Sequence, residues 1–200
     1  MAPYIFMLMM IVGISNVSFA QASYEVASSK MTIAGSSNVH DWESSVTQLT
    51  AAAELSMENG ILKSIKTLSV EIPVKGIKSS KGSVMDKKTW GALKQESNPT
   101  ITYKLTKLTA LDKSGDSYSI KATGNLSIAG TTKAIEMDVK GKLLSDGSLQ
   151  FDGSKALLMT DFGIDPPTAL MGTMKTRNEI TISFSVKMKD KAGNNKTSAK

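Results

Sequence analysis

Apolar and polar residues alternate along most of the chain between Tyr24 and Lys189, which is typical of β-strands with one buried face and one wet face. The final run is the clearest example, because every second residue from Ile180 to Met188 is apolar and the residues between them are polar or charged. Shorter runs of the same kind span 68–74, 101–105, 118–128 and 133–140. The pattern therefore predicts a protein built almost entirely from β-strands.

Short turn motifs separate these runs. They are Glu58-Asn59-Gly60, Lys113-Ser114-Gly115-Asp116, Ser145-Asp146-Gly147 and Asp152-Gly153. Asn-Gly and Asp-Gly pairs favour tight hairpins, because these residues tolerate the positive φ angles that such turns require. Most neighbouring strands are therefore expected to be antiparallel partners joined by short turns.

One segment, 83–97, departs from the alternation. Met85, Trp90 and Leu93 recur there at roughly helical spacing before Asn98-Pro99 ends the segment, so a single short helix is expected. About eight strands and one helix predict an all-β fold, a closed antiparallel barrel, because closure removes the exposed strand edges that invite aggregation. A sandwich of two sheets is the structural alternative.

The two ends of the chain differ from its middle. Residues 1–22 contain no charged side chain, and an apolar run from Ile5 to Ile14 is followed by small residues, which predicts a secretory signal cleaved after Ala20 or Ala22. A membrane anchor is the alternative, but the run is shorter than the roughly 20 residues needed to cross a bilayer. The expected product is an exported, periplasmic or secreted protein with one domain at 23–190. The tail 191–200 lacks large apolar residues and is expected to be disordered.

Composition narrows the chemistry. The chain has no cysteine, which excludes disulfides, thiol catalysis and thiolate metal sites. It carries 24 basic and 18 acidic residues, for a net charge of +6. The basic residues are spread along the strands rather than gathered on one face with aromatic residues, so nucleic-acid binding is not expected.

His40 is the only histidine, so any Ser-His-Asp triad or histidine ligand would have to use it. Alternation places His40 and Trp42 on one face of a strand and Asp41 and Glu43 on the other, so these groups cannot converge on a metal without a bulge. A ligand contact and a structural role in the strand entry both stay open for His40. Asp161-Phe162-Gly163 matches a kinase tripeptide, but no other kinase motif accompanies it. No catalytic set, metal site or cofactor is predicted.

A loop broken by Pro166-Pro167 carries an unusual amount of apolar surface, in Phe162, Ile164, Leu170 and Met171. One hypothesis is that this loop, with the helix bearing Trp90 and Leu93, closes the mouth of the barrel over a ligand. The alternative is that these side chains simply plug one end of the barrel.

Four segments carry a family resemblance. They are TIAGSSNVHDWE (32–43), MDKKTWGALKQESNPTITYK (85–104), GNLSIAGTTKAIEMDV (124–139) and MTDFGIDPPTALMG (159–172). In this order and spacing, across Tyr24 to Lys189, they resemble the YceI-like family of exported polyisoprenoid-binding proteins. The resemblance implies a lipocalin-like antiparallel barrel whose apolar interior holds a long isoprenoid, such as a quinone tail or a polyprenyl lipid, and it implies no catalytic residues.

The residues expected to contact such a ligand are mainly the apolar faces of the strands, the helix and the proline-broken loop. They are His40, Trp42, Leu68, Val70, Ile72, Trp90, Leu93, Ile101, Tyr103, Ile120, Leu126, Met137, Met159, Phe162, Ile164, Ile182 and Phe184. The expected function is lipid transport, storage or stress protection by a monomer or homodimer, with brief contact with membranes. The alternatives are a lipid-modifying enzyme using His40 and a nearby carboxylate, and an outer-membrane barrel, for which the few aromatic residues provide no interfacial girdles.

Overall fold

The computed structural model describes residues 20–169 and 173–192, in which strands dominate. The strands are β1 (Ala20–Ser37), β2 (Asp41–Val46), β3 (Thr50–Glu58), β4 (Ile61–Pro73), β5 (Ile77–Ser79), β6 (Thr100–Ser114), β7 (Ser117–Ile128), β8 (Thr131–Leu143), β9 (Leu149–Leu158), β10 (Thr168–Ala169) and β11 (Met174–Asp190). The helices are α1 (Ser83–Ala92) and two 3₁₀ turns, η1 (Val74–Gly76) and η2 (Met159–Phe162). None of these helices is long and apolar enough to cross a bilayer.

Some predictions fall on the remaining residues. Most of the expected signal segment, the loop residues Leu170 and Met171, and the tail from residue 193 onward lie outside the described residues. Strand β1 already includes Ala20, and Gln21 pairs with Ser56 in β3, so the sheet begins before the expected domain boundary at residue 23.

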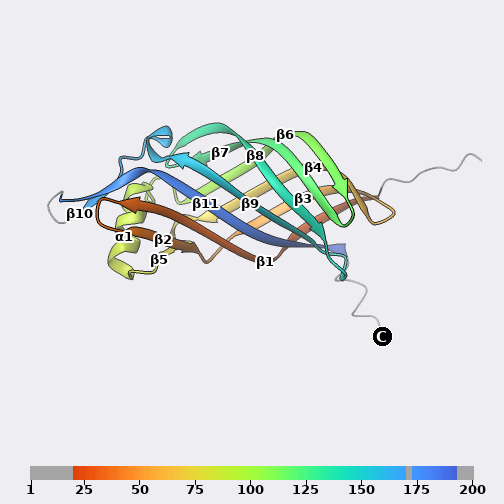
Figure 1. The fold of residues 1–200 in the computed structure, drawn as a ribbon, viewed down its shortest axis with the longest axis horizontal. Helices are drawn as coiled ribbons and strands as arrows, with labels where there is room; N and C mark the ends of the chain where they lie inside the picture. The colour runs from red at the N-terminus through yellow and green to blue at the C-terminus, as the bar shows by residue number, and fades with distance from the viewer. Residues whose placement is uncertain (1–19, 170–172, 193–200) are drawn as a thin grey trace, which may run out of the picture.

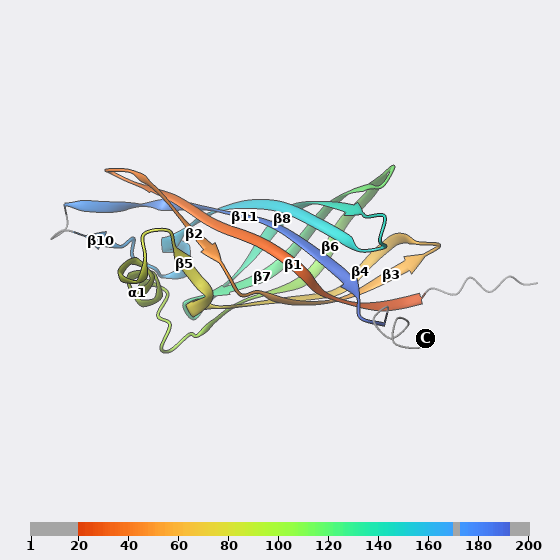
Figure 2. The same cartoon turned by 90° about the horizontal axis from the view of Figure 1, so that it is seen from below.

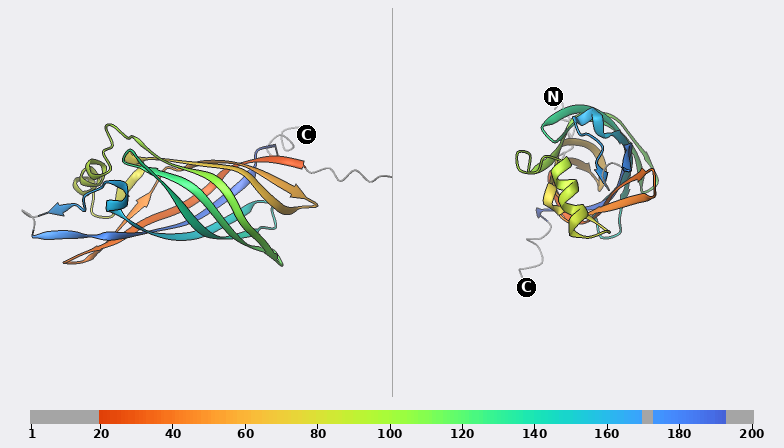
Figure 3. Two further views of the ribbon diagram at one scale, coloured as in Figure 1. Left: turned by 90° about the horizontal axis from the view of Figure 1, so that it is seen from above. Right: turned by 90° about the vertical axis from the view of Figure 1, so that its left-hand side faces the viewer.

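Eight strands close into a ring. Their order is β1, β3, β4, β6, β7, β8, β9 and β11, and β11 returns to pair with β1, with every neighbouring pair antiparallel. The closing ladder runs from Tyr24 opposite Asp190 to Ser37 opposite Thr176. The predicted closed barrel with one α-helix is therefore confirmed, and viewed along its length it appears as a ring with α1 lying across one end (Figure 3).

The long strand β1 pairs with two different strands along one edge. Its first part, Ala20–Glu25, pairs with β3, and its later part, Met31–Ser36, pairs with β2, which continues the sheet to β5. Strands β2, β5 and β10 gather with α1 at one end of the barrel, whereas the β3–β4 and β6–β7 hairpins extend from the other end (Figures 1 and 2). We refer to these as the helix end and the hairpin end.

Three of the four predicted turns join consecutive strands. Asn59-Gly60, Gly115 and Gly147 have positive φ angles and connect β3 to β4, β6 to β7 and β8 to β9. The expected turn at Asp152-Gly153 is wrong, because both residues lie within β9 and Gly153 pairs with Phe184 of β11. The glycine is used for close packing instead: a Cβ atom there would collide with the ring of Phe184.

The predicted helix is present but shorter than its segment. Helix α1 ends at Ala92, and the chain continues in turns up to Asn98-Pro99, with Lys94 in the left-handed region at φ 52°. Asp86 is buried in the first turn of α1, where its carboxylate accepts a hydrogen bond from the Ser79 backbone N–H at 2.7 Å and pairs with Lys78 at 3.4 Å. These contacts fasten the start of the helix to β5.

The hairpin end is closed by its own side chains. Tyr24, Leu62, Tyr118 and Leu149 are all at most 5% exposed and pack in one cluster there. The Leu62 backbone N–H donates a buried hydrogen bond to the Tyr118 hydroxyl oxygen at 3.1 Å. Burial, with a smaller contribution from the negative charge of Asp190, raises the pKa of Tyr24. This end is therefore a packed core rather than an opening.

The Tyr118 contact gives the first prediction. Tyr118→Phe should lower the free energy of unfolding by about 1–3 kcal/mol, because it leaves the Leu62 N–H buried without an acceptor. Urea denaturation followed by circular dichroism measures the change. Tyr103→Phe is the matched control, because the Tyr103 hydroxyl forms no hydrogen bond with another described residue. An equal loss in both variants would contradict the role assigned to Tyr118.

Candidate ligand-binding cavity

A large cavity, which we call the lumen, occupies the interior of the barrel between the helix end and the closed hairpin end. Its volume is about 570 Å³, within the range of roughly 300–1,000 Å³ typical of small-molecule sites. Its lining is mainly Leu, Ile, Val, Met and Phe side chains from the inward faces of all eight barrel strands. The apolar face of the alternating strands thus turns inward, whereas a membrane-spanning barrel turns that face outward.

The strand residues facing the lumen are not packed as a solid core. Leu68, Val70, Ile72 and Met137 point inward but remain only partly buried, in contrast to Tyr118 and Leu149 at the hairpin end, which are 2% and 0% exposed. An interior filled by its own side chains would bury all of them. The eight-stranded barrel therefore keeps an interior space for a molecule other than itself.

Aromatic residues widen the lumen by lying over glycines of the neighbouring strand. The ring of Trp42 covers Gly35, that of Tyr103 covers Gly124, and that of Phe184 covers Gly153. A Cβ atom on each glycine would overlap the ring, so the missing side chain lets the ring lie against the wall instead of projecting inward. These pairs give the lumen a smooth apolar surface at three places.

Nearly all of the predicted contact residues line this space. They are His40, Trp42, Leu68, Val70, Ile72, Leu93, Ile101, Tyr103, Ile120, Leu126, Met137, Met159, Phe162, Ile164, Ile182 and Phe184. Trp90 is not among the lining residues. Its indole N–H donates a hydrogen bond to the Ile77 carbonyl oxygen at 3.0 Å, and the Lys78 ammonium lies 4.3 Å from the centre of its ring. Trp90 therefore anchors α1 to β5 rather than facing a ligand.

His40 lies at the rim of the lumen, in the turn between β1 and β2, and its side chain is exposed. Its Nδ1 atom lies 3.0 Å from the Asp41 carbonyl oxygen, and its own carbonyl accepts a hydrogen bond from the Ser37 backbone N–H at 2.9 Å. Asp161, the acidic residue of the kinase-like tripeptide, forms an ion pair with Lys133 at 3.1 Å. Within the described residues, no group of three or more acidic or histidine side chains is arranged to hold a metal ion.

The helix end carries the mouth of the lumen. Leu93 after α1, Phe162 in η2 and Ile164 pack together there, and Phe162 is only 2% exposed. The Lys94 ammonium donates a hydrogen bond to the Gly163 carbonyl oxygen at 3.1 Å, which ties the chain after α1 to the loop after η2. The helix and this loop therefore do lie together at one opening, as the lid hypothesis requires.

Sequence analysis missed many lining residues, which come from all eight strands of the barrel. Five of them, on β1 and β9, are Met31, Ile33, Phe151, Lys155 and Leu157. The alternation of Met31 and Ile33 with their neighbours could have identified these two residues as inward-facing. Phe151 and Leu157 were hidden because Asp152-Gly153 between them resembles a turn, and nothing in the sequence marks a lysine as facing an apolar interior.

Few polar atoms interrupt the apolar lining between the mouth and the hairpin end. Burial raises the pKa of the Tyr103 phenol, so this group stays protonated at neutral pH and offers a hydrogen-bond donor to the lumen. Lys155, at an inward position of β9, adds a positive charge. The cavity can therefore hold a largely hydrocarbon molecule that carries a small polar group.

Solved structures share this fold at low sequence identity. BcnA of Burkholderia cenocepacia is 17% identical, with a TM-score of 0.63 over 80% of this chain and 95% of that one. A polyisoprenoid binding domain from Saccharophagus degradans, implicated in plant cell wall breakdown, is 9% identical, with a TM-score of 0.65 over 86% of this chain and 99% of that one. A Campylobacter jejuni YCEI protein is 17% identical, with a TM-score of 0.57 over 94% of this chain and 97% of that one.

Comparison with curated proteins gave no match. A family model, by contrast, covers most of the chain: the YceI-like domain matches residues 15–188, which include α1 and all eight strands of the barrel except the last two residues of β11. The match agrees with the barrel described above and with the low-identity structural neighbours. The chain therefore belongs to the YceI-like family.

Proposed function

We propose that this protein binds a long apolar lipid of the isoprenoid type in its lumen and carries or stores it outside the cytoplasm. The observation that supports this best is the lumen itself, a space of about 570 Å³ lined mainly by aliphatic side chains. The Saccharophagus degradans protein of the same fold is a polyisoprenoid binding domain. Export is inferred from the signal-like residues 1–22.

The energetics favour a long ligand over a short one. Burying a five-carbon isoprene unit contributes on the order of 4 kcal/mol before costs, at about 0.8 kcal/mol per buried CH₂. Association costs roughly 4–15 kcal/mol in lost freedom. Several isoprene units are therefore needed for tight retention, and a lumen whose lining runs from Leu93 at the mouth to Met188 of the hairpin-end cluster suits a chain rather than a compact molecule.

Binding fits the site better than catalysis does. A lipid-modifying enzyme would need an acid or base beside the buried ligand. His40 is exposed at the rim, with its ring beside a backbone carbonyl, and none of the described lining residues is Asp or Glu. Loss of lipid turnover on His40→Ala, if such turnover were measured, would support the enzyme instead.

The helix end is the surface through which a lipid would pass to or from a membrane. Val39 and Val84 are 62% and 68% exposed there, beside the mouth residues His40 and Met85. Lys81 and Lys88 at the same rim add positive charge, which attracts anionic lipid surfaces. Brief membrane contact at this end is part of the proposal.

The direct test is to purify the protein under native conditions, extract it with organic solvent and identify the released molecules by mass spectrometry. We expect about one prenyl lipid per protein chain. A folded protein that releases no lipid, and that does not bind farnesol or a longer prenyl alcohol added in solution, would contradict the proposal.

Narrowing the lumen should weaken binding. Gly153→Ala places a methyl group where the Phe184 ring lies, so the ring must move inward, at a stability cost of about 1–3 kcal/mol. We expect several-fold weaker binding of the neutral fluorophore N-phenyl-1-naphthylamine, with a second change, Phe184→Leu, restoring it. Gly91→Ala is the control, because a Cβ atom there meets nothing within 4 Å. Unchanged affinity in folded Gly153→Ala would place the probe outside the lumen.

The mouth gives a further prediction. Trp90→Ala removes the indole that fastens α1 to Ile77. We expect the probe to leave several-fold faster in stopped-flow measurements, while the denaturation midpoint changes little. Phe162→Ala empties a fully buried site and should cost about 3–5 kcal/mol in stability as well. Val84→Ala, on the exposed side of α1, is the control. A release rate in Trp90→Ala equal to that of the wild type would reject the lid and leave a simple plug.

A further inference from the structure

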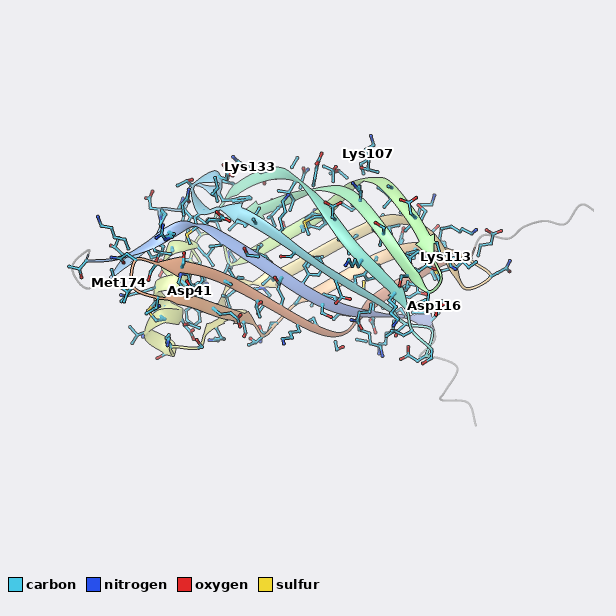
Figure 4. All side chains as sticks on the ribbon, viewed as in Figure 1. Asp41, Lys107, Lys113, Asp116, Lys133 and Met174 are labelled. Atoms are coloured by element: carbon cyan, nitrogen blue, oxygen red, sulfur yellow. The ribbon has the colours of Figure 1, made fainter. Side chains whose placement is uncertain are left out.

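The wall of the barrel is interrupted between β8 and β9. These strands pair only from Val139 opposite Gly153 to Leu143 opposite Leu149. Beyond Val139, toward the helix end, β8 continues against β7 and β9 continues against β11, but the two strands no longer pair with each other. A cleft lies between them on the outside of the barrel, bordered by residues 133–136 of β8 and 155–158 of β9. Lys133, at its edge, is labelled in Figure 4.

Lys155 is placed at this interruption. It lies two residues beyond Gly153 and opposite Ile182 of β11, and it lines both the lumen and the outer cleft. Its side chain is partly buried, yet it forms no ion pair or hydrogen bond with another described residue. A lysine on an apolar inner face usually has a partner, because an unpaired charge is costly to bury. Lys155 therefore has an ammonium group available to a bound molecule.

The charges around the lumen have one sign. Its lining, within the described residues, includes Lys81, Lys88 and Lys155 but no Asp or Glu. Lys81 and Lys88 are exposed at the mouth, where water and salt screen them. Lys155 lies in the wall rather than at the mouth, and its side chain is partly buried, so salt screens it less than it screens the two exposed lysines.

The acidic residues nearby do not neutralise Lys155. Asp161 is paired with Lys133, and Glu136 and Glu179 are exposed side chains at the outer cleft. Alternation along β8 places Glu136 on the outer face, because Ile135 and Met137 line the lumen. The inner side of the gap is therefore positive, while the carboxylates stay on its outer side.

Resting on the proposed function, we infer that the lumen selects lipids with an anionic head group, a carboxylate or a phosphate, and that Lys155 holds this head in the gap between β8 and β9 while the hydrocarbon tail fills the lumen. The tail would lie along Phe151, Phe184 and Ile120 toward the hairpin end. The head would then remain close to water through the gap, whereas a head at the mouth would contact Lys81 and Lys88 instead.

Two pairs of ligands test this inference, each with the same tail and a different head: palmitic acid against hexadecanol, and farnesyl phosphate against farnesol. Affinities are measured by displacement of N-phenyl-1-naphthylamine at pH 7.5. The wild type should bind the anion about tenfold more tightly than the alcohol in at least one pair, which is the scale of a charge-assisted hydrogen bond. The pair that shows the preference distinguishes carboxylate from phosphate.

Variants locate the head. Lys155→Met should abolish the preference while leaving alcohol binding intact, and Lys155→Arg should retain it. Lys133→Met, at the outer edge of the same gap, and the double variant Lys81→Met/Lys88→Met at the mouth should leave it unchanged, with circular dichroism confirming the fold of each variant.

Three results would overturn or limit the inference in different ways. Equal binding of anion and alcohol by the wild type rejects the anionic preference but leaves lipid binding in the lumen standing. Loss of the preference in the mouth variant, and not in Lys155→Met, rejects Lys155 as the head-group contact. Failure of all four ligands to bind rejects the proposed function itself.

Discussion

The pairing of β1 with β11 is the interaction on which the rest of the structure depends. It joins the first and last long strands of the chain and turns an eight-stranded sheet into a ring, in which β8 and β9 leave their facing edges unpaired only beyond Val139. Without it, the alternating faces would still form a sheet, but the apolar face would be open to water along its whole length. Closure therefore converts an ordinary amphipathic pattern into an enclosed apolar volume, lined by the inward residues of all eight strands.

The two ends of this ring have different chemistry, and that difference gives the lumen a direction. At the hairpin end, Tyr118 accepts a hydrogen bond from the Leu62 backbone and fills the barrel together with Tyr24 and Leu149, so the interior there resembles any protein core. At the helix end, η2, the following loop and α1 are separate elements that meet over the opening through few contacts, including the Lys94–Gly163 hydrogen bond. Elements held by few contacts open at lower free energy than a ladder of strands does. Entry and exit of a ligand therefore belong to the helix end.

The sequence predicts this fold well because period-two alternation reports directly which residues face inward, and the lumen is defined by those residues. Glycine is where prediction failed. Gly60 and Gly147 occupy turns with positive φ angles, as their neighbours Asn59 and Asp146 suggest, whereas Gly153 lies inside β9, where it makes room for Phe184. The sequence alone does not distinguish a glycine needed for a turn from a glycine needed under an aromatic ring. Only the strand pairing distinguishes the two. The expected ligand contact of Trp90 has a related explanation. Helical spacing places Trp90 in the helix, but it does not reveal that the indole N–H donates a hydrogen bond to Ile77 in β5.

Lys155 shows how a local defect in the ladder and a charge in the lining depend on each other. In a fully paired wall, an inward ammonium group would be enclosed by hydrocarbon, and the loss of its hydration would destabilise the barrel. Because β8 and β9 separate beyond Val139, the lysine can pack its methylene groups on the apolar wall while its ammonium reaches water through the gap. The anionic head group of a ligand has only to replace that water. The Lys155 charge is therefore hydrated when the barrel is empty, and it favours anionic ligands when the barrel is filled. The interruption in the sheet and the positive charge on its inner edge thus form a single site. The gap keeps the ammonium hydrated, and the ammonium gives the gap its preference for an anionic head group.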